Sequence, residues 1–227
     1  MSETKVVTAA LIIVGNEILS GRTRDANLQF LGEQLNELGI RMRECIVVPD
    51  VEDTIVAAVN DYRARFDYVF TTGGIGPTHD DITSAAVAKA FGTEVYRHLE
   101  AEAALLAMYK PEDVTPARMK MADVPKGASL IPNPVSTAPG FRMENVFTMA
   151  GVPRIMQAMF KEIAHDLTGG AKVLSASVTT HVPEGKIGVR LGEIQDKYPD
   201  ADIGSYPFWK DGRPGTSLVV RHVDAAV

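Results

Sequence analysis

The residues with the clearest chemical meaning form one run, TTGGIGPTHDDIT, at positions 71–83. Glycines let backbone N–H groups approach an anion closely, and a helix that begins after them adds partial positive charge. We therefore predict a phosphate-binding loop whose ligand contacts are Gly73, Gly74, Ile75, Gly76 and Thr78. The alternative is an ordinary tight turn in which Thr78 or Asp80 caps the next helix. The run lacks the Gly-Lys-Ser/Thr of a Walker loop and the GxGxxG of a dinucleotide-binding fold.

Four carboxylates follow three successive apolar segments: Glu17, Asp50, Asp80 and Asp81. If those segments are parallel strands, their carboxyl ends share one edge of a sheet, and we expect the four side chains to converge there. A magnesium ion is usually held by one or two carboxylates together with substrate phosphates. We predict that Glu17, Asp80 and Asp81 bind such a divalent ion. Two alternatives stay open: these residues favour helix starts, or they bind an amide or hydroxyl of a ligand.

A second polar loop, NPVSTAPGF, occupies positions 133–141. Its prolines stiffen it, which lowers the entropic cost of binding, and its side chains offer hydrogen bonds. We predict that it holds the polar edge of a ligand through Asn133, Ser136, Thr137, Pro139 and Gly140. The alternative is a plain surface turn. The segment at 150–153 begins a further helix, whose N-terminus also suits an anion.

The remaining reactive or aromatic residues receive plainer interpretations. We expect His79 to be exposed, and Cys45, inside an apolar segment, to be a buried hydrophobe rather than a nucleophile. Arg22 and Arg24 are either cationic contacts near the ligand or solvated surface. The aromatic run at 206–209 is expected to pack in a core, with a partner-contact surface as the alternative.

Alternating strands and helices are predicted to position these residues. Apolar, β-branched runs predict strands at 6–14, 42–48, 68–72, 129–131 and 146–149. Helical periodicity predicts helices at 25–38, 51–66, 80–91 and 151–167, and a helical stretch at 100–121 that is broken at Pro111 and Pro116. This order predicts an α/β fold, a three-layer α/β/α arrangement around a doubly wound, mostly parallel sheet.

The pattern changes at Thr168-Gly169-Gly170, which is the best candidate for a domain boundary. Residues 1–168 are predicted to form the ligand-binding domain, and residues 171–227 a small α/β subdomain. In the second part we expect strands at 172–182, 201–206 and 216–223 and a helix at 185–198.

Composition narrows the class of protein. The 227 residues carry 23 Lys and Arg against 29 Asp and Glu, a net charge of −6, which argues against a nucleic-acid binder. A single cysteine excludes an internal disulfide and a Cys-rich metal site. No apolar run approaches the roughly 20 residues of a membrane helix, and no signal peptide is evident. We therefore expect a cytoplasmic protein that binds neither nucleic acid nor membrane.

Four motifs together carry a family resemblance: GNEILSGRTRDAN, TTGGIGPTHDDIT, NPVSTAPGF and AGVP. In this order and spacing they resemble the amino-terminal domain of the competence/damage-inducible protein A (CinA) family, which has the MoaB/Mog molybdopterin-binding fold. The resemblance spans residues 5–167. In the tail, EGKIG and IGSYPFW resemble the small domain that follows in this family.

The resemblance implies a three-layer fold, often assembled as dimers or trimers, that takes molybdopterin or a nucleotide diphosphate. In molybdopterin adenylyltransferases of this fold, two aspartates act in the transfer, and they match Asp50 and Asp81 here. Some CinA-type domains are metal-dependent ADP-ribose pyrophosphatases, for which we expect magnesium or cobalt. A chain of 227 residues is not expected to hold the carboxyl-terminal deamidase domain of full CinA proteins as well.

Several positions depart from the family pattern. Asn16 stands where Asp is common, which removes a carboxylate beside Glu17, and Ser136 replaces a Gly. Likewise His79 and Ala150 replace prolines. Three hypotheses follow: a metal-dependent pyrophosphatase or a related adenylyltransferase, a module that binds molybdopterin or a nucleotide without turnover, and a protein that acts through its aromatic segment. For the first two, we expect a homo-oligomer with a small-molecule ligand.

Overall fold

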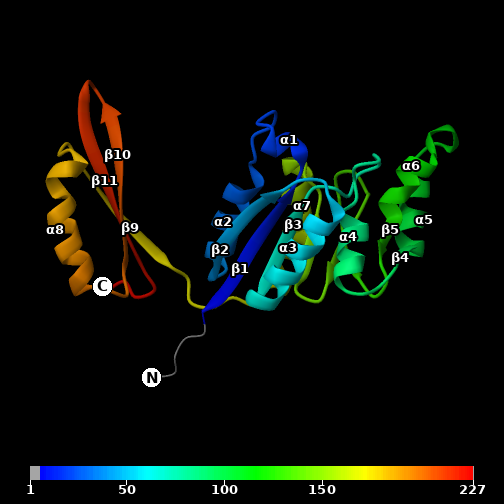
Figure 1. The fold of residues 1–227 in the computed structure, drawn as a ribbon, viewed down its shortest axis with the longest axis horizontal. Helices are drawn as coiled ribbons and strands as arrows, with labels where there is room; N and C mark the ends of the chain where they lie inside the picture. The colour runs from blue at the N-terminus through cyan, green and yellow to red at the C-terminus, as the bar shows by residue number, and fades with distance from the viewer. Residues whose placement is uncertain (1–5, 227) are drawn as a thin grey trace. The chain divides into compact units, whose positions relative to one another are not determined.

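The computed structural model describes residues 6–226, which divide into two units (Figure 1). Unit 1 extends to Gly170, and unit 2 begins at Ala171. Unit 1 contains a six-stranded and a two-stranded sheet, and unit 2 contains a three-stranded sheet. None of the helices formed by residues 6–226 is long and apolar enough to span a membrane.

Unit 1 is built on a six-stranded sheet with the strand order β2-β1-β3-β8-β7-β6. Neighbouring strands among β2, β1, β3 and β8 are parallel, whereas β7 is antiparallel to both of its neighbours. The strands are β1 (Val7–Val14), β2 (Ile40–Val48), β3 (Tyr68–Thr72), β6 (Ser129–Ile131), β7 (Gly140–Met143) and β8 (Val146–Met149). The predicted mostly parallel sheet is therefore confirmed.

Helices cover both faces of this sheet, as the burial of β1 shows. Ile12 and Val14 lie in one core cluster, and Leu11 and Ile13 lie in the other, because side chains alternate along a strand. The first cluster is completed by α3 (Glu52–Arg65) and α4 (Thr83–Ala90), and the second by α2 (Asn27–Glu37) and α7 (Pro153–Ile163), which continues into η3 (Ala164–Asp166). The three-layer α/β/α arrangement follows.

The predicted breaks at two prolines are confirmed. Helix α5 (Leu99–Met108) ends before Pro111, and α6 (Pro116–Met119) begins at the second proline, with Thr115 accepting the Arg118 N–H as its cap. The short helices η1 (Pro111–Asp113) and η2 (Lys120–Ala122) flank α6. Strands β4 (Val95–Arg97) and β5 (Asp123–Pro125) form a separate two-stranded sheet beside these helices.

Some local features of unit 1 differ from the prediction. Helix α1 (Asn16–Leu19) and strands β4, β5 and β7 were not anticipated. Helix α4 begins at Thr83, three residues later than predicted, so Asp80 and Asp81 lie in the loop before it.

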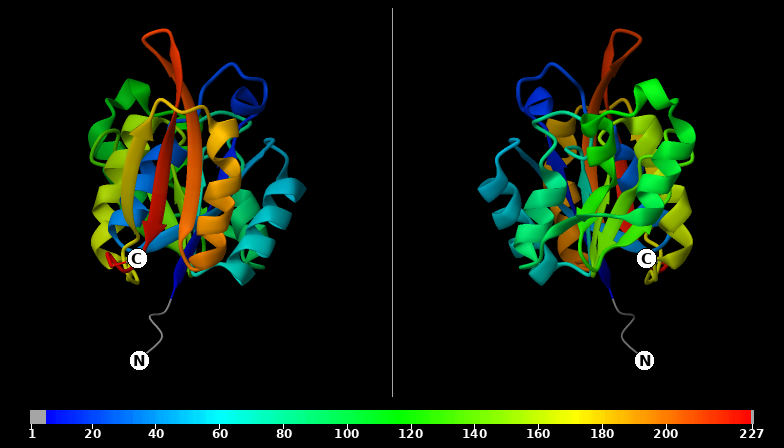
Figure 2. Two further views of the ribbon diagram at one scale, coloured as in Figure 1. Left: turned by 90° about the vertical axis from the view of Figure 1, so that its left-hand side faces the viewer. Right: turned by 90° about the vertical axis from the view of Figure 1, so that its right-hand side faces the viewer.

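Unit 2 is a three-stranded antiparallel sheet, ordered β10-β11-β9, with helix α8 (Glu184–Lys197) lying along it (Figure 2). Its strands are β9 (Leu174–Thr180), β10 (Asp202–Lys210) and β11 (Arg213–His222). The aromatic run on β10 does not form a core, so that expectation was wrong. Tyr206 is 47% exposed and Trp209 is 73% exposed, because both lie on a strand whose side chains are largely uncovered.

Candidate functional site

The turns that follow β1, β3 and β8 meet backbone to backbone at one edge of the unit 1 sheet. Gly73 has a φ of +98°, and a Cβ at this position would overlap the carbonyl oxygen of Val14. A Cβ at Gly151 would lie 3.1 Å from the Gly73 Cα. Side chains are thus excluded at the centre of this edge, and the surrounding loops enclose an open space above it.

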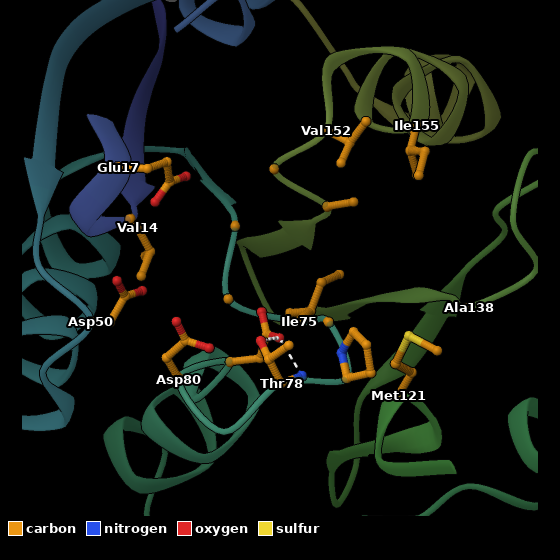
Figure 3. A pocket seen from close by; sticks show the side chains of 18 of the residues that line it. Val14, Glu17, Asp50, Ile75, Thr78, Asp80, Met121, Ala138, Val152 and Ile155 are labelled. Carbon is orange, nitrogen blue, oxygen red and sulfur yellow. Dashed lines mark hydrogen bonds between the residues drawn. The ribbon is translucent and has the colours of Figure 1, made fainter. Parts of the chain in front are cut away.

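That space is a cavity of about 470 Å³ (Figure 3). Glu17, Asp50, Asp80 and Asp81 all line it, so the four carboxylates do share one edge of the sheet. The other predicted ligand contacts that line it are Gly73, Gly74, Ile75, Gly76, Thr78, Asn133 and Ser136. His79 does not, and its side chain is 98% exposed, as expected.

Three predicted ligand contacts do not reach the cavity: Thr137, Pro139 and Gly140. The side chain of Asn133 explains this, because its oxygen accepts the N–H groups of Val135 and Ser136 while its amide donates to Ser136 Oγ and to the Ala138 carbonyl. These bonds fold the loop onto itself, and Pro139 and Gly140 become buried. Asn133 therefore organises the loop and has little capacity left for a ligand.

The glycine loop is held at its base and leaves backbone donors at its tip. The Gly73 N–H donates to the Met149 carbonyl at 3.1 Å, so this predicted phosphate contact is already engaged. Thr83 fixes the loop twice: its N–H donates to Gly74 O and its hydroxyl donates to Gly73 O, both at 2.9 Å. Within residues 6–226, the N–H groups of Gly74, Ile75 and Gly76 have no hydrogen-bond acceptor. Three consecutive donors are thus available to an anion.

Asp81 closes the turn after these donors. Its carboxylate accepts the Thr78 N–H at 2.7 Å and also the Thr78 hydroxyl, and it packs against Gly76, where a Cβ would lie 2.7 Å from it. Lys120 donates to the Thr78 carbonyl at 2.8 Å from the other side. Because the residue before α4 is Ile82, neither Thr78 nor Asp80 caps that helix, and the capping alternative was wrong.

Asp80 is exposed and remains charged over a wide pH range. The Thr78 hydroxyl, followed by the Asp80 backbone N–H, lowers the pKa of its carboxyl, and the charges of His79 and Lys120 act in the same direction. The hydroxyl carries a single proton, and in this geometry that proton goes to Asp81. When Thr78 donates to Asp81, the Asp80 backbone N–H and the charges of His79 and Lys120 still hold the pKa of Asp80 below its usual range.

The first two acidic residues have local roles as well. Asp50 accepts the Asn16 N–H at 2.9 Å and so supports the start of α1, whereas α3, the helix that follows it in the chain, has no side-chain cap. The Glu17 carboxylate folds back over Gly15, where a Cβ would lie 2.5 Å from it. Both side chains are partly exposed and line the cavity.

Protein atoms alone do not assemble a metal centre here. Among residues 6–226, no three His, Cys, Asp or Glu side chains are grouped so that they could hold an ion. The predicted trio of Glu17, Asp80 and Asp81 is therefore not a preformed site. The arrangement suits an ion that arrives with a phosphate and needs one or two carboxylates.

The opposite wall of the cavity is apolar, and sequence reasoning missed it. Met121, Val152 and Ile155 stand across from Glu17, Asp50 and Asp80 in Figure 3. Met121 comes from η2, and the other two flank the Pro153 start of α7. The described lining contains no Lys, Arg or His. Arg22 and Arg24 are not part of it.

Comparison with known proteins identifies relatives for both units. Residues 10–169 match the family of probable molybdopterin binding domains, and residues 172–227 match the middle domain of FAD synthase. A protein of Pyrobaculum calidifontis is 39% identical over 211 residues, which cover 88% of this chain and 80% of that protein. A protein of Archaeoglobus fulgidus is 34% identical over 209 residues, 92% of this chain and 87% of the relative.

Two further relatives carry the CinA name. A CinA-like protein of Desulfosudis oleivorans is 36% identical over 209 residues, 86% of this chain and 51% of that protein, so this chain spans about half its length. The crystal structure of CinA from Thermoplasma acidophilum, a protein described as having unknown function, is similar to this chain with a TM-score of 0.67. That match is 38% identical and covers 71% of this chain and 98% of the crystallised one.

Proposed function

Because the chain belongs to the MoaB/Mog family of molybdopterin-binding domains, and within it to the CinA type, we propose that its cavity binds a pterin or nucleotide carrying a phosphate or pyrophosphate. One observation carries the proposal: the three acceptor-free N–H groups of Gly74, Ile75 and Gly76 lie between an acidic wall and an apolar wall. The N–H groups suit a phosphate, and the apolar wall suits a flat ring.

The acidic side of the cavity requires that such a ligand bring a compensating positive charge. Glu17, Asp50 and Asp80 repel a bare pyrophosphate, and the described lining supplies no cationic side chain to offset them. A divalent ion such as magnesium or cobalt, brought in on the phosphates, fits one or two of these carboxylates. When bound, such an ion offsets phosphoryl charge and lowers the pKa of a coordinated water.

For turnover, we propose hydrolysis of an ADP-ribose-like pyrophosphate. Water adds to one phosphorus, the bridging P–O bond breaks, and two phosphomonoesters leave. Asp81 and Asp50 are the proposed catalytic pair. Asp81 holds Thr78 beside the free N–H groups, and Asp50 faces the same space from the end of β2.

The test is turnover of ADP-ribose with magnesium or with cobalt by the native chain and by Asp81→Asn. The matched control is Asp166→Asn, a half-exposed aspartate outside the cavity. We expect Asp81→Asn to lose most activity, roughly a hundredfold or more if the residue assists proton transfer, and the control to keep it. Equal and negligible turnover by all three proteins would refute the hydrolase.

A second candidate is binding without turnover, because Asp50 and Asp81 both already accept backbone N–H groups. Asn16, which departs from the Asp of the family pattern that the motifs resemble, points the same way. In that case a pterin or adenine nucleotide raises the unfolding temperature, since a ligand that binds only the folded state must stabilise it, and no product forms. Adenylyl transfer would instead release pyrophosphate from ATP when a pterin is present.

A further inference from the structure

A small recess adjoins the cavity where β3 leads into the glycine loop. Its volume is about 40 Å³. Five residues line both the recess and the cavity: Val14, Glu17, Thr23, Gly151 and Pro153. A water molecule or a group of similar size fits into such a volume, whereas an aromatic ring does not.

Two buried side chains at the recess each have an oxygen without a partner. Thr72, the last residue of β3, is 1% exposed, and Asn27, the first residue of α2, is 3% exposed. Both residues line the recess, and within residues 6–226 neither Thr72 Oγ1 nor Asn27 Oδ1 has a hydrogen-bond partner. Because buried polar atoms are nearly always hydrogen-bonded, these two atoms need a partner from outside the chain.

The chemistry of the two side chains defines the group that satisfies both. The Asn27 Nδ2 donates to the Gly151 carbonyl at 2.8 Å, which leaves Asn27 Oδ1 as an acceptor. Thr72 offers a hydroxyl proton, so its partner must accept a hydrogen bond. A hydroxyl group accepts from Thr72 and donates to Asn27 at the same time. By contrast, a ring N–H only donates and a carbonyl oxygen only accepts.

The recess lies between the two parts of the cavity that we assign to a nucleotide. On one side, Thr72 is followed directly by the glycine loop, whose free N–H groups suit a phosphate. On the other side, Gly151 and Pro153 flank Val152, which belongs with Ile155 to the apolar wall (Figure 3). The ribose of a nucleotide joins its ring to its phosphate, so a nucleotide held at both parts has its ribose beside the recess.

We propose that the recess takes a ribose hydroxyl of the nucleotide, which donates to Asn27 Oδ1 and accepts from the Thr72 hydroxyl. The site then selects ribonucleotides over deoxyribonucleotides. This inference rests on the proposed function, because it requires a nucleotide in the cavity. It assigns Asn27 and Thr72 as residues that determine specificity for the sugar.

The test compares three nucleotides, each with magnesium, by titration calorimetry on the full chain: ADP, 2′-deoxy-ADP and 3′-deoxy-ADP. We expect one of the two deoxynucleotides to bind at least about fivefold more weakly than ADP, because the two buried groups then stay unpaired or must immobilise a water. The other deoxynucleotide should bind as ADP does, since the recess has room for one hydroxyl-sized group.

Three variants locate this preference. Thr72→Val removes the hydroxyl, which has no partner within residues 6–226, and nearly keeps the shape of the side chain, so the preference for ADP should fall. Thr72→Ser retains the hydroxyl and should restore the preference. The matched control is Thr71→Val, because the Thr71 hydroxyl donates to Thr148 Oγ1 on the opposite face of the sheet, and this variant should keep the preference. Thermal unfolding verifies that each variant is folded.

The possible failures can be told apart. Equal binding of all three nucleotides by the native chain overturns this inference alone, since the recess would then hold only water. A preference for ADP that Thr72→Val leaves unchanged also overturns it, because the sugar would then be recognised elsewhere. If ADP itself does not bind, the nucleotide part of the proposed function is overturned together with this inference.

Discussion

Replacing Thr83 by Val should loosen the conformation of the glycine loop at 73–76 without changing the sequence of the loop. The Thr83 hydroxyl donates to Gly73 O at 2.9 Å, and the whole residue is 0% exposed. Valine has nearly the same shape but no hydroxyl, so the carbonyl of Gly73, a buried residue, loses this donor. We expect weaker stability and weaker ligand binding from the same cause.

The size of the stability loss follows from burial. An unsatisfied buried acceptor costs about 1–3 kcal/mol. For a chain of this length, each kcal/mol lowers the unfolding temperature by roughly 2–4 °C. A loss of about 2 kcal/mol therefore lowers the unfolding temperature of unit 1 by roughly 4–8 °C. The single tryptophan, Trp209, lies in unit 2, so calorimetry rather than tryptophan fluorescence is the suitable measurement.

A matched control separates the loop from general destabilisation. The Thr71 hydroxyl donates to Thr148 Oγ1 at 3.0 Å, and Thr71 is also 0% exposed, but this bond lies within the sheet. Thr71→Val should lose comparable stability and keep the stabilisation conferred by ADP-ribose with magnesium. Thr83→Ser retains the hydroxyl and should also keep the stabilisation by the ligand. Thr83→Val should lose that stabilisation.

Two results would refute this reasoning. If Thr83→Val unfolds at the same temperature as the native chain, the hydrogen bond to Gly73 contributes nothing. If Thr83→Val and Thr71→Val are stabilised equally by the ligand, the loop conformation does not depend on Thr83, and the N–H groups after Gly73 are not positioned by it.

Three further outcomes are expected. Because the pKa of Asp80 is lowered in the folded chain, its carboxylate stabilises the fold at pH values above its ordinary pKa of 3.8. This contribution is lost as the pH falls through the lowered pKa. Acid unfolding of Asp80→Asn should therefore depend less on pH below about 4 than acid unfolding of the native chain. Burial, followed by the charge of Asp25, raises the pKa of the Cys45 thiol to about 11, so Ellman's reagent at pH 8 should label it slowly until urea is added. Without a divalent ion, added salt should strengthen rather than weaken nucleotide diphosphate binding, because it screens repulsion by the acidic wall; titration calorimetry at two salt concentrations checks the sign.

Those parts of the fold that depend on burial were predictable from the sequence. Strand β3 has the predicted bounds, since the run of five β-branched and aromatic residues between Asp67 and Gly73 is short for a helix and favours a buried strand. Helix α1 was missed because its four residues are too few to show periodicity. Strand β7 was missed because it begins directly after the prolines of the preceding loop, which argue against regular structure.

The candidate site was predictable to the extent that it follows from strand ends. The meeting of Asp50 with Asp81 follows from a parallel sheet, whose strands all end at one edge. Met121 could not be foreseen, because it reaches the cavity through the packing of segments distant in sequence. Thr137 was wrongly predicted to contact the ligand, because the hydrogen bonds of Asn133 fold its loop onto itself. The number of polar side chains in a loop does not show in which direction the loop turns.

The described lining of the cavity contains no cationic side chain, and this determines which ligands the site can select. A lysine or arginine would attract any anion, whereas backbone N–H groups after a glycine turn favour a phosphate only at one position and in one orientation. The carboxylates opposite them then oppose every phosphate that lacks a compensating ion. For the ligand that we propose, selection therefore acts on charge and shape together, because that ligand combines a neutralised phosphate at Gly74–Gly76 with a ring against Met121 and Ile155. A free phosphate satisfies only the first requirement, and an uncharged ring satisfies only the second.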